Sequence, residues 1–171
     1  MTTKAERTRT FAWDDPTTGL SAARTLSGLE YLRAMQRREL PGPPIAATLD
    51  FTIAEIDEGR VVFAVIPAEF HYNPIGAVHG GLAATLCDSA MGCAVHSTLP
   101  AGTAYTTIEL KVNYIRALTK ETGLVRCEGK TIVVGGRIAT AEARMTDAAG
   151  TLYAHATTTC LIMRPQRRER S

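Results

Sequence analysis

Residues 79–97 read HGGLAATLCDSAMGCAVHS, in which His-Gly-Gly leads into 82–97, a stretch that is apolar or small almost all the way round a helical projection. A helix of that composition is one that other elements cover on nearly every side. Within residues 81–98 Asp88 is the only acidic residue and His96 the only basic one. The stretch therefore predicts a long buried helix that carries one isolated carboxylate.

The sequence on both sides of this helix predicts a set of strands and one further helix. A short amphipathic helix is expected at 27–38, where it stops before a Pro-Gly-Pro-Pro run. Runs rich in Val, Ile, Thr and Phe predict strands at 45–56, 60–66, 105–115, 123–134, 137–146 and 152–163. Because short turns join most successive strands, the sheet should be antiparallel and the fold class α+β.

The length of 171 residues fits one domain. We expect this domain at 27–163, with a polar leader at 1–26 and a basic tail at 164–171. The tail holds four arginines and one glutamate, so the rest of the chain is close to neutral and nucleic acid is not expected as a partner. The dispersed cysteines and histidines predict no metal site.

Neither a membrane span nor a secretory signal is expected. No apolar run approaches the ~18 residues that a membrane-spanning helix needs. The first 25 residues contain no uninterrupted apolar segment of the kind that a signal peptide requires. We therefore expect a cytoplasmic protein that does not act at a membrane.

Asp88 lies in the middle of the predicted buried helix, between Cys87 and Ser89. An isolated buried carboxylate costs several kcal/mol, so its presence requires an explanation. One alternative is structural, a carboxylate that neighbouring backbone amides hold by hydrogen bonds. The other is functional, a general base or a nucleophile in a partly dry cleft.

His79, Gly80 and Gly81 form the predicted start of the helix. Consecutive glycines let backbone amides approach a ligand, and a helix N-terminus presents unpaired N–H groups that can serve as an oxyanion hole. Glycines at such a junction can also be simple steric fillers. Asp88 lies about 12 Å from Gly80 along one helix. The two groups can act on one carbonyl only if a second copy of the helix runs antiparallel nearby, as in a two-fold dimer.

The helix and its flanks carry a family resemblance. HGGLAATLCD at 79–88 is preceded by NPIGAV at 73–78 and followed by TIELKVNYIR at 107–116. In this spacing, residues from about 45 to 163 resemble the PaaI-like branch of the hotdog-fold acyl-CoA thioesterases. The resemblance implies an antiparallel sheet wrapped round one long central helix, paired into homodimers or homotetramers. It also implies hydrolysis of a thioester to a carboxylic acid and free coenzyme A.

The resemblance further implies a role for each matching position. Asn73 would help to place the attacking water or the thioester, and the Gly80 amide would bind the thioester oxygen. His79 would shape the loop and orient that donor. Asp88, from the other subunit, would be the general base or nucleophile, and Thr107 would place a hydroxyl beside it.

These positions also have structural alternatives. Asn73 can simply form an Asx turn, and His79 can simply cap the helix. Strict alternation along 107–114 puts Thr107 on the strand face opposite to Leu110 and Val112, and the sequence does not say which face borders the site.

A second group of residues is expected to contact the substrate. Gly81 joins Gly80 as a candidate backbone donor. The cations Arg116, Lys130 and Arg137 could meet the phosphates of a nucleotide handle at a dimer edge, although each could equally be a solvated surface charge. His96, near the helix end, is expected to be structural.

We therefore expect an acyl-CoA thioesterase that hydrolyses a medium-chain or aryl acyl thioester with the help of Asp88. No cofactor is expected, since coenzyme A is part of the substrate. Two alternatives stay open: a hotdog hydratase or dehydratase of enoyl thioesters, and a hotdog module that binds acyl-CoA without catalysis. A measurement of thiol release against water addition separates the enzymes.

Overall fold

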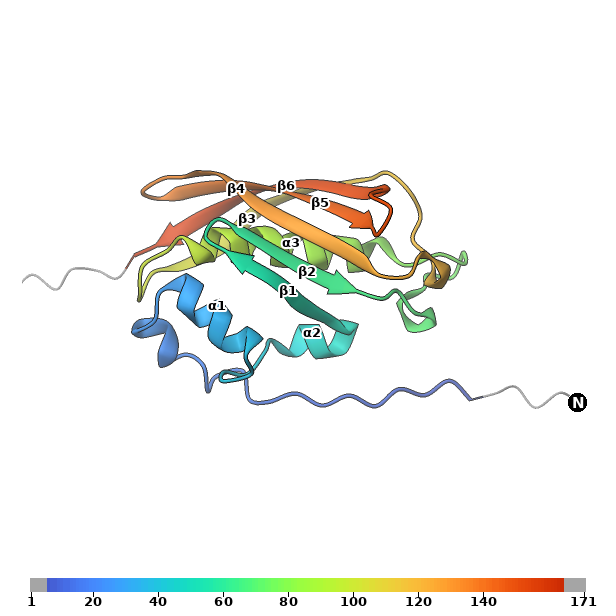
Figure 1. Cartoon of the computed structure of the whole chain (residues 1–171), viewed down its shortest axis with the longest axis horizontal. Coiled ribbons are helices and arrows are strands. Elements are labelled where there is room, and N and C mark those ends of the chain that lie inside the picture. Colours follow the sequence, from blue (N-terminus) through green and yellow to red (C-terminus); the bar gives the residue numbers. More distant parts are fainter. Residues whose placement is uncertain (1–5, 165–171) are drawn as a thin grey trace, which may run out of the picture.

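A computed structural model describes residues 6–164, in which one sheet covers one long helix (Figure 1). The helices are α1 (Gly28–Gln36), α2 (Pro44–Leu49) and α3 (Gly80–Ser97), with single 3₁₀ turns at Ala22–Arg24, Glu69–His71 and Lys120–Thr122. The strands are β1 (Phe51–Asp57), β2 (Arg60–Val65), β3 (Ala104–Tyr114), β4 (Val125–Val134), β5 (Ile138–Asp147) and β6 (Leu152–Met163).

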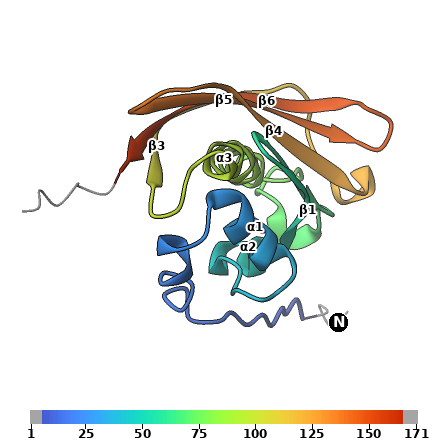
Figure 2. The ribbon, with the colours of Figure 1, turned by 60° about the vertical axis from the view of Figure 1, so that its left-hand side comes forward.

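The six-stranded sheet has the order β1-β2-β4-β5-β6-β3, and all neighbouring strands run antiparallel. Hairpins connect β1 to β2, β4 to β5 and β5 to β6, whereas β3 lies at the far edge beside β6. Figure 2 looks almost along α3 and shows the sheet curving over it. The predicted α+β hotdog fold, an antiparallel sheet wrapped round one central helix, is confirmed.

The side of α3 that faces the sheet forms the centre of the core. Fully buried side chains on this side include Leu86, Cys87, Ala90, Met91 and Val95. On β4, a Cβ added at Gly129 would lie 2.3 Å from the carbonyl carbon of Ala90, so only glycine lets this strand cross the helix so closely. The prediction of a long buried helix at this position is confirmed.

The predicted helix at 27–38 is α1, which ends slightly earlier, at Gln36. A capping box starts it: the Ser27 side chain accepts a hydrogen bond from the Glu30 N–H, and the Glu30 carboxylate accepts one from the Ser27 N–H at 3.0 Å. A Cβ added at Gly28 would lie 1.7 Å from the carbonyl oxygen of His96. The start of α1 is therefore packed directly on the last turn of α3.

The prediction of a strand over 45–56 is wrong in its first half, because Pro44–Leu49 forms α2. Proline suits a first helical turn, where its missing N–H would have no partner, and the alanines that follow favour helix. Asp50 ends α2 in the left-handed region with φ 55°, and β1 begins at the next residue. Apolar composition alone did not separate a buried helical turn from a strand.

Both ends of the chain extend beyond the described residues. The part of the predicted leader that is described contacts the body: the Arg9 guanidinium lies 4.1 Å from the centroid of the Phe70 ring and donates to the Ala47 and Thr48 carbonyl oxygens. Residues 1–5 of the leader and 165–171 of the predicted tail lie outside the described range. Among residues 6–164, no helix has the length and apolar character needed to span a membrane.

Candidate active site

Asp88 lies on a half-buried stripe of α3. Residues of this stripe recur at helical spacing, and they are Gly81, Ala84, Thr85, Asp88 and Ser89. The Asp88 carboxylate accepts a hydrogen bond from the Thr107 hydroxyl of β3, with 2.8 Å between Oδ1 and Oγ1. Within residues 6–164 the carboxylate accepts no other hydrogen bond. The structural alternative, in which backbone amides of a neighbouring loop hold the carboxylate, is therefore not observed.

Thr107 faces α3 because β3 bulges directly after it. The register of β3 against β6 skips Ile108, whose side chain is 56% exposed. The bulge resets the alternation of the strand, so Thr107 lies on the same inner face as Leu110 and Val112, which pack against the core. The expectation that strict alternation puts Thr107 on the opposite face is therefore wrong, because a period of two cannot show where a strand gains a residue.

Tyr105 and Cys93 are neighbours of Asp88 that the sequence reasoning missed. Tyr105 of β3 and Cys93 of α3 line the same space as Asp88. Burial raises the pKa of Cys93 to about 12, and burial likewise raises the pKa of Tyr105 well above its usual value, with the charge of Asp88 a smaller cause for both groups. Both side chains therefore stay protonated near neutral pH. The position of Tyr105, two residues before Thr107 on one strand, was the signal that could have found it.

The start of α3 is capped by His79, whose Nδ1 accepts a hydrogen bond from the Gly81 N–H at 2.8 Å. The ring proton therefore belongs on Nε2. The helix-cap alternative for His79 is the arrangement observed, and the Gly81 N–H, a predicted substrate contact, already has a partner. In contrast, no acceptor for the Gly80 N–H is found within residues 6–164. A Cβ added at Gly80 would lie 3.0 Å from the ring of Tyr114, so a larger residue would displace that ring.

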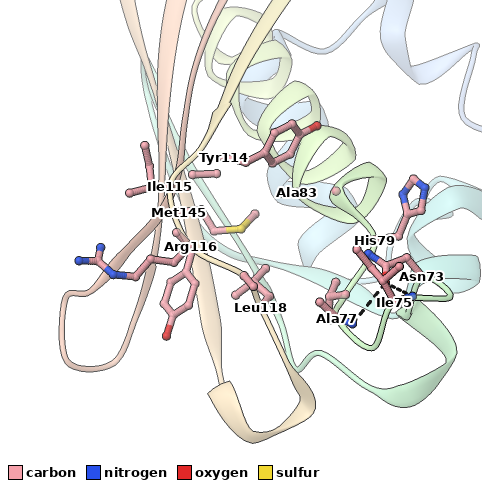
Figure 3. Close-up of a pocket in the computed structure, with 15 residues that line it drawn as sticks. Asn73, Ile75, Ala77, His79, Ala83, Tyr114, Ile115, Arg116, Leu118 and Met145 are labelled. Atoms are coloured by element: carbon pink, nitrogen blue, oxygen red, sulfur yellow. Dashed lines mark hydrogen bonds between the residues drawn. The ribbon is translucent and has the colours of Figure 1, made fainter.

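A cavity of about 340 Å³, here called the Gly80 cavity, lies between the loop before α3 and the end of β3 (Figure 3). Asn73 lines it, and its Oδ1 accepts hydrogen bonds from the Ile75 N–H at 3.0 Å and the Ala77 N–H at 3.2 Å. The Asx-turn alternative for Asn73 is thus the arrangement observed. Arg116 also lines this cavity, and its guanidinium donates a hydrogen bond to the Leu152 carbonyl oxygen at 2.9 Å.

Asp88 and Thr107 line a different cavity of about 360 Å³, here called the Asp88 cavity. Neither residue lines the Gly80 cavity, and neither Asn73 nor His79 lines the Asp88 cavity. Within one chain the carboxylate and the Gly80 amide therefore open onto separate spaces. This separation agrees with the distance of about 12 Å along α3 that the sequence predicted.

Lys130 and Arg137 lie away from both cavities. Lys130 is 2.7 Å from the Glu128 carboxylate, which also pairs with Arg60 of β2 at 2.6 Å. Hydrogen bonding to Lys130, followed by that to Arg60, lowers the pKa of Glu128. Arg137 is exposed at the turn between β4 and β5. Of the three predicted cations, Arg116 therefore lines the Gly80 cavity, whereas Lys130 and Arg137 line neither cavity.

Two other histidines have structural surroundings. Nδ1 of His71 accepts a hydrogen bond from the Ala68 N–H at 3.0 Å, and its Nε2 lies 2.9 Å from the Leu49 carbonyl oxygen. Burial lowers the pKa of His71. His155 lies 3.6 Å from the Glu142 carboxylate. In the part of the chain that the structure describes, no three His, Cys, Asp or Glu side chains gather where they could hold a metal ion.

Comparisons with known sequences agree with this architecture. Residues 75–154, which include α3 and most of the strands after it, match the family model of the thioesterase superfamily. A provisionally named esterase of Halobacterium salinarum is 39% identical over 84 residues, which are 48% of this chain and 54% of that protein. The chain thus matches about half the length of this curated relative.

Solved structures share the fold. A phenylacetic acid degradation-related protein of Ralstonia eutropha superposes with a TM-score of 0.70 at 28% identity, over 77% of this chain and 98% of that one. The Escherichia coli PaaI protein, from the phenylacetic acid degradation operon, has a TM-score of 0.69 at 18% identity, over 81% and 96%. A Streptococcus mutans protein solved with bound acetyl CoA has a TM-score of 0.61 at 23% identity, over 68% and 91%.

The fold is that of a hotdog protein, and its central helix holds both candidate reactive groups, the Gly80 N–H and the Asp88 carboxylate. The part of the chain that matches the thioesterase superfamily, residues 75–154, contains this helix. The predicted resemblance to PaaI-like hotdog thioesterases is confirmed.

Proposed function

We propose that two copies of this chain form composite active sites that hydrolyse acyl-CoA thioesters, with a medium-chain or aryl acyl group released as the free acid. The observation that carries this proposal is that the two candidate reactive groups of α3 line different cavities. Gly80, whose N–H has no acceptor among the described residues, lines one cavity, and the Asp88 carboxylate lines the other. A partner subunit brings the two kinds of group together.

The edge of the sheet supports such a pairing. β3 is an edge strand of eleven residues, and within the described chain it pairs on one side only, with β6. A long unpaired edge invites another strand to join it. The small residues Gly81, Ala84 and Ser89 on the half-buried stripe of α3 leave space for a second helix beside this edge. A two-fold axis at β3 would set Gly80 of one copy toward Asp88 of the other.

The proposed chemistry needs a base, an oxyanion donor and a positioned water. The Gly80 N–H donates to the thioester oxygen as the carbonyl carbon becomes tetrahedral. Asp88 of the other copy takes a proton from water while the water oxygen attacks that carbon. The C–S bond then breaks, the sulfur leaves as coenzyme A and takes up a proton, and the acid is released. Direct attack by the carboxylate followed by hydrolysis gives the same products.

Neutral groups beside Asp88 suit this role. The Thr107 hydroxyl donates to one carboxylate oxygen, which fixes the carboxylate and leaves the other oxygen free to accept from water. Tyr105 and Cys93 keep their protons near neutral pH, so no second negative charge competes with Asp88 for the proton. The structure thus favours one defined base rather than a coupled pair.

The coenzyme A portion is assigned to the side of Gly80. Arg116 lines the Gly80 cavity and supplies a cation there for a phosphate group. The acetyl CoA bound to the Streptococcus mutans relative supports a CoA thioester as the substrate class. No cofactor other than this part of the substrate takes part in the proposal. The cytoplasmic location and the dimer or tetramer stay predictions of the sequence.

The test is a subunit complementation assay. Asp88→Asn should lower kcat for thiol release by about 10²–10⁴-fold, because the base is lost while the shape of the side chain is kept. Gly80→Val should remove the oxyanion donor by displacing the Tyr114 ring and the helix start. Each variant alone should be nearly inactive. Mixed heterodimers should regain part of the activity, since one of their two sites holds both intact groups.

The outcome also separates this proposal from its alternatives. Unchanged thiol release by Asp88→Asn would remove Asp88 from the mechanism. No recovery in verified heterodimers would show that each site lies within one subunit. Water addition to an enoyl thioester, without thiol release, would favour a hydratase. Binding of acyl-CoA without either reaction would favour a module that only binds it.

A further inference from the structure

The Asp88 cavity is enclosed by parts of the chain that lie far apart in sequence. One wall is α3 between Asp88 and His96, and the facing wall is α1, which contributes Tyr31 and Met35. The Pro-Gly-Pro-Pro turn at 41–44 lines the space as well. Within the described chain, the central helix, the N-terminal segment and strands β1, β2 and β3 therefore all contribute to this cavity.

The charges of the lining exclude the nucleotide of the substrate from this cavity. The described residues that line it include no Lys or Arg, and burial lowers the pKa of His96, so the lining supplies no cation near neutral pH. Phosphate groups placed here would meet a carboxylate without a compensating cation. The aromatic rings of Phe51 and Phe63, which also line the cavity, suit an uncharged group instead.

The cavity has one end at Asp88 and another end at a cluster of tilted rings. His96 lies about 12 Å along α3 from Asp88. The His96 ring centroid is 5.7 Å from that of Tyr31 and 5.5 Å from that of Tyr105. Cys93 lies between the two ends on the same helix and also lines the cavity. The packing of Gly28 on the His96 carbonyl fixes this end, so Tyr31 cannot retreat without moving α1.

We infer that this cavity holds the acyl group of the substrate and that Tyr31, from α1, sets the greatest acyl length that the site accepts. The inference rests on the proposed function and adds to it a specificity-determining element outside the catalytic residues. The carbonyl end of the substrate lies at Asp88, and the acyl chain runs along α3 toward His96. Each protomer thus contributes the base and the acyl cavity, while its mate contributes the amide donor and the cation.

The experiment measures kcat/KM over a series of saturated acyl-CoA thioesters of increasing length. Tyr31→Ala should move the optimum to longer chains and raise kcat/KM about tenfold or more for substrates two methylenes longer than the native optimum. Cys93→Leu, which fills the middle of the cavity, should move the optimum to shorter chains. The matched control is Arg33→Ala on the exposed face of α1, which should leave the length profile unchanged.

A binding measurement makes the test independent of turnover. Calorimetry with non-hydrolysable acyl-CoA thioethers of the same lengths should show the same shifts, while the affinity for free coenzyme A stays within twofold of the native value in all variants. If Tyr31→Ala proves unstable, Tyr31→Leu keeps a packed apolar side chain on α1 and should give a smaller shift in the same direction.

The results distinguish the two proposals. Optima for hydrolysis and thioether binding that do not move in either variant would overturn the acyl-length inference while leaving the thioesterase proposal standing. A native chain that releases no thiol from any thioester would overturn the proposed function. In that case the length dependence of thioether binding still decides whether Tyr31 limits this cavity.

Discussion

The two halves of α3 differ in what they offer to a ligand. The N-terminal half presents backbone: an N–H group at Gly80 without an acceptor in the described chain, kept accessible by the lack of side chains. The C-terminal half presents side chains, from Asp88 to His96, inside a cavity that α1 closes. In the proposed function, the first half needs the Asp88 carboxylate of another copy, and the second half needs the Gly80 N–H of another copy. Within one chain the two groups line separate cavities.

The two halves also differ in how the chain stabilises them. At the start of α3 a single side chain, His79, satisfies one of the otherwise unpaired N–H groups. Around the Asp88 cavity three elements converge, since β3 supplies Thr107, α1 supplies Tyr31, and α3 itself supplies Cys93. The backbone half is therefore a local feature, whereas the side-chain half depends on tertiary packing.

The largest of the remaining predicted effects is a loss of kcat in a variant of Thr107, the residue that holds the Asp88 carboxylate in the C-terminal half of the site. Thr107→Val removes the hydrogen bond to Asp88 and keeps the shape of the side chain. Because a hydrogen bond to a charged group contributes about 1.5–3 kcal/mol, kcat for thiol release should fall by about 10- to 100-fold with little change in KM. Steady-state kinetics with one acyl-CoA checks this.

Two controls sharpen that measurement. Thr107→Ser keeps the hydroxyl and should retain most of the activity. Thr106→Val changes the exposed neighbour on the other face of β3 and should have no effect. Equal rates for Thr107→Val and Thr106→Val would show that the orientation of the carboxylate does not depend on this contact.

The next prediction concerns the backbone half. His79→Ala removes the cap from α3 and should lower the free energy of unfolding by about 1 kcal/mol, as loss of an N-cap usually does. Urea denaturation followed by circular dichroism measures this. His79→Asn supplies another capping side chain and should restore most of the loss. A stable His79→Ala with lost thiol release would instead mean that the imidazole takes part in the reaction.

The smallest effect concerns the far end of α3, where the helix dipole favours a positive charge on His96 but burial opposes it. Burial prevails and lowers the pKa of His96. The unfolded chain therefore takes up this proton first as the pH falls through about 6.5, so the folded state loses stability below that pH. His96→Gln should flatten the decline in thermal midpoint between about pH 7 and pH 5. An identical decline in both proteins would assign it to other groups.

The sequence determined the features that arise from local pattern. The apolar circumference of 82–97 predicted the buried helix, and the isolated carboxylate within it predicted the candidate base. The spacing from Gly80 to Asp88 predicted that the two groups would not meet in one chain, because the rise of a helix is fixed. Asn73 and His79 needed no long-range contact for their turn and cap, so both alternatives could be foreseen.

Tertiary structure alone decided which side chains surround Asp88. The bulge at Ile108 puts Thr107 on the face of β3 that packs against α3, where its hydroxyl reaches the Asp88 carboxylate. The helix α2 replaced part of an expected strand, which let the 41–44 turn reach the Asp88 cavity. Local preferences differ by little between such arrangements, so the packing of distant segments selects among them. The contact between Tyr31 of α1 and His96 of α3 is the clearest case, because these two residues become neighbours only when the core forms.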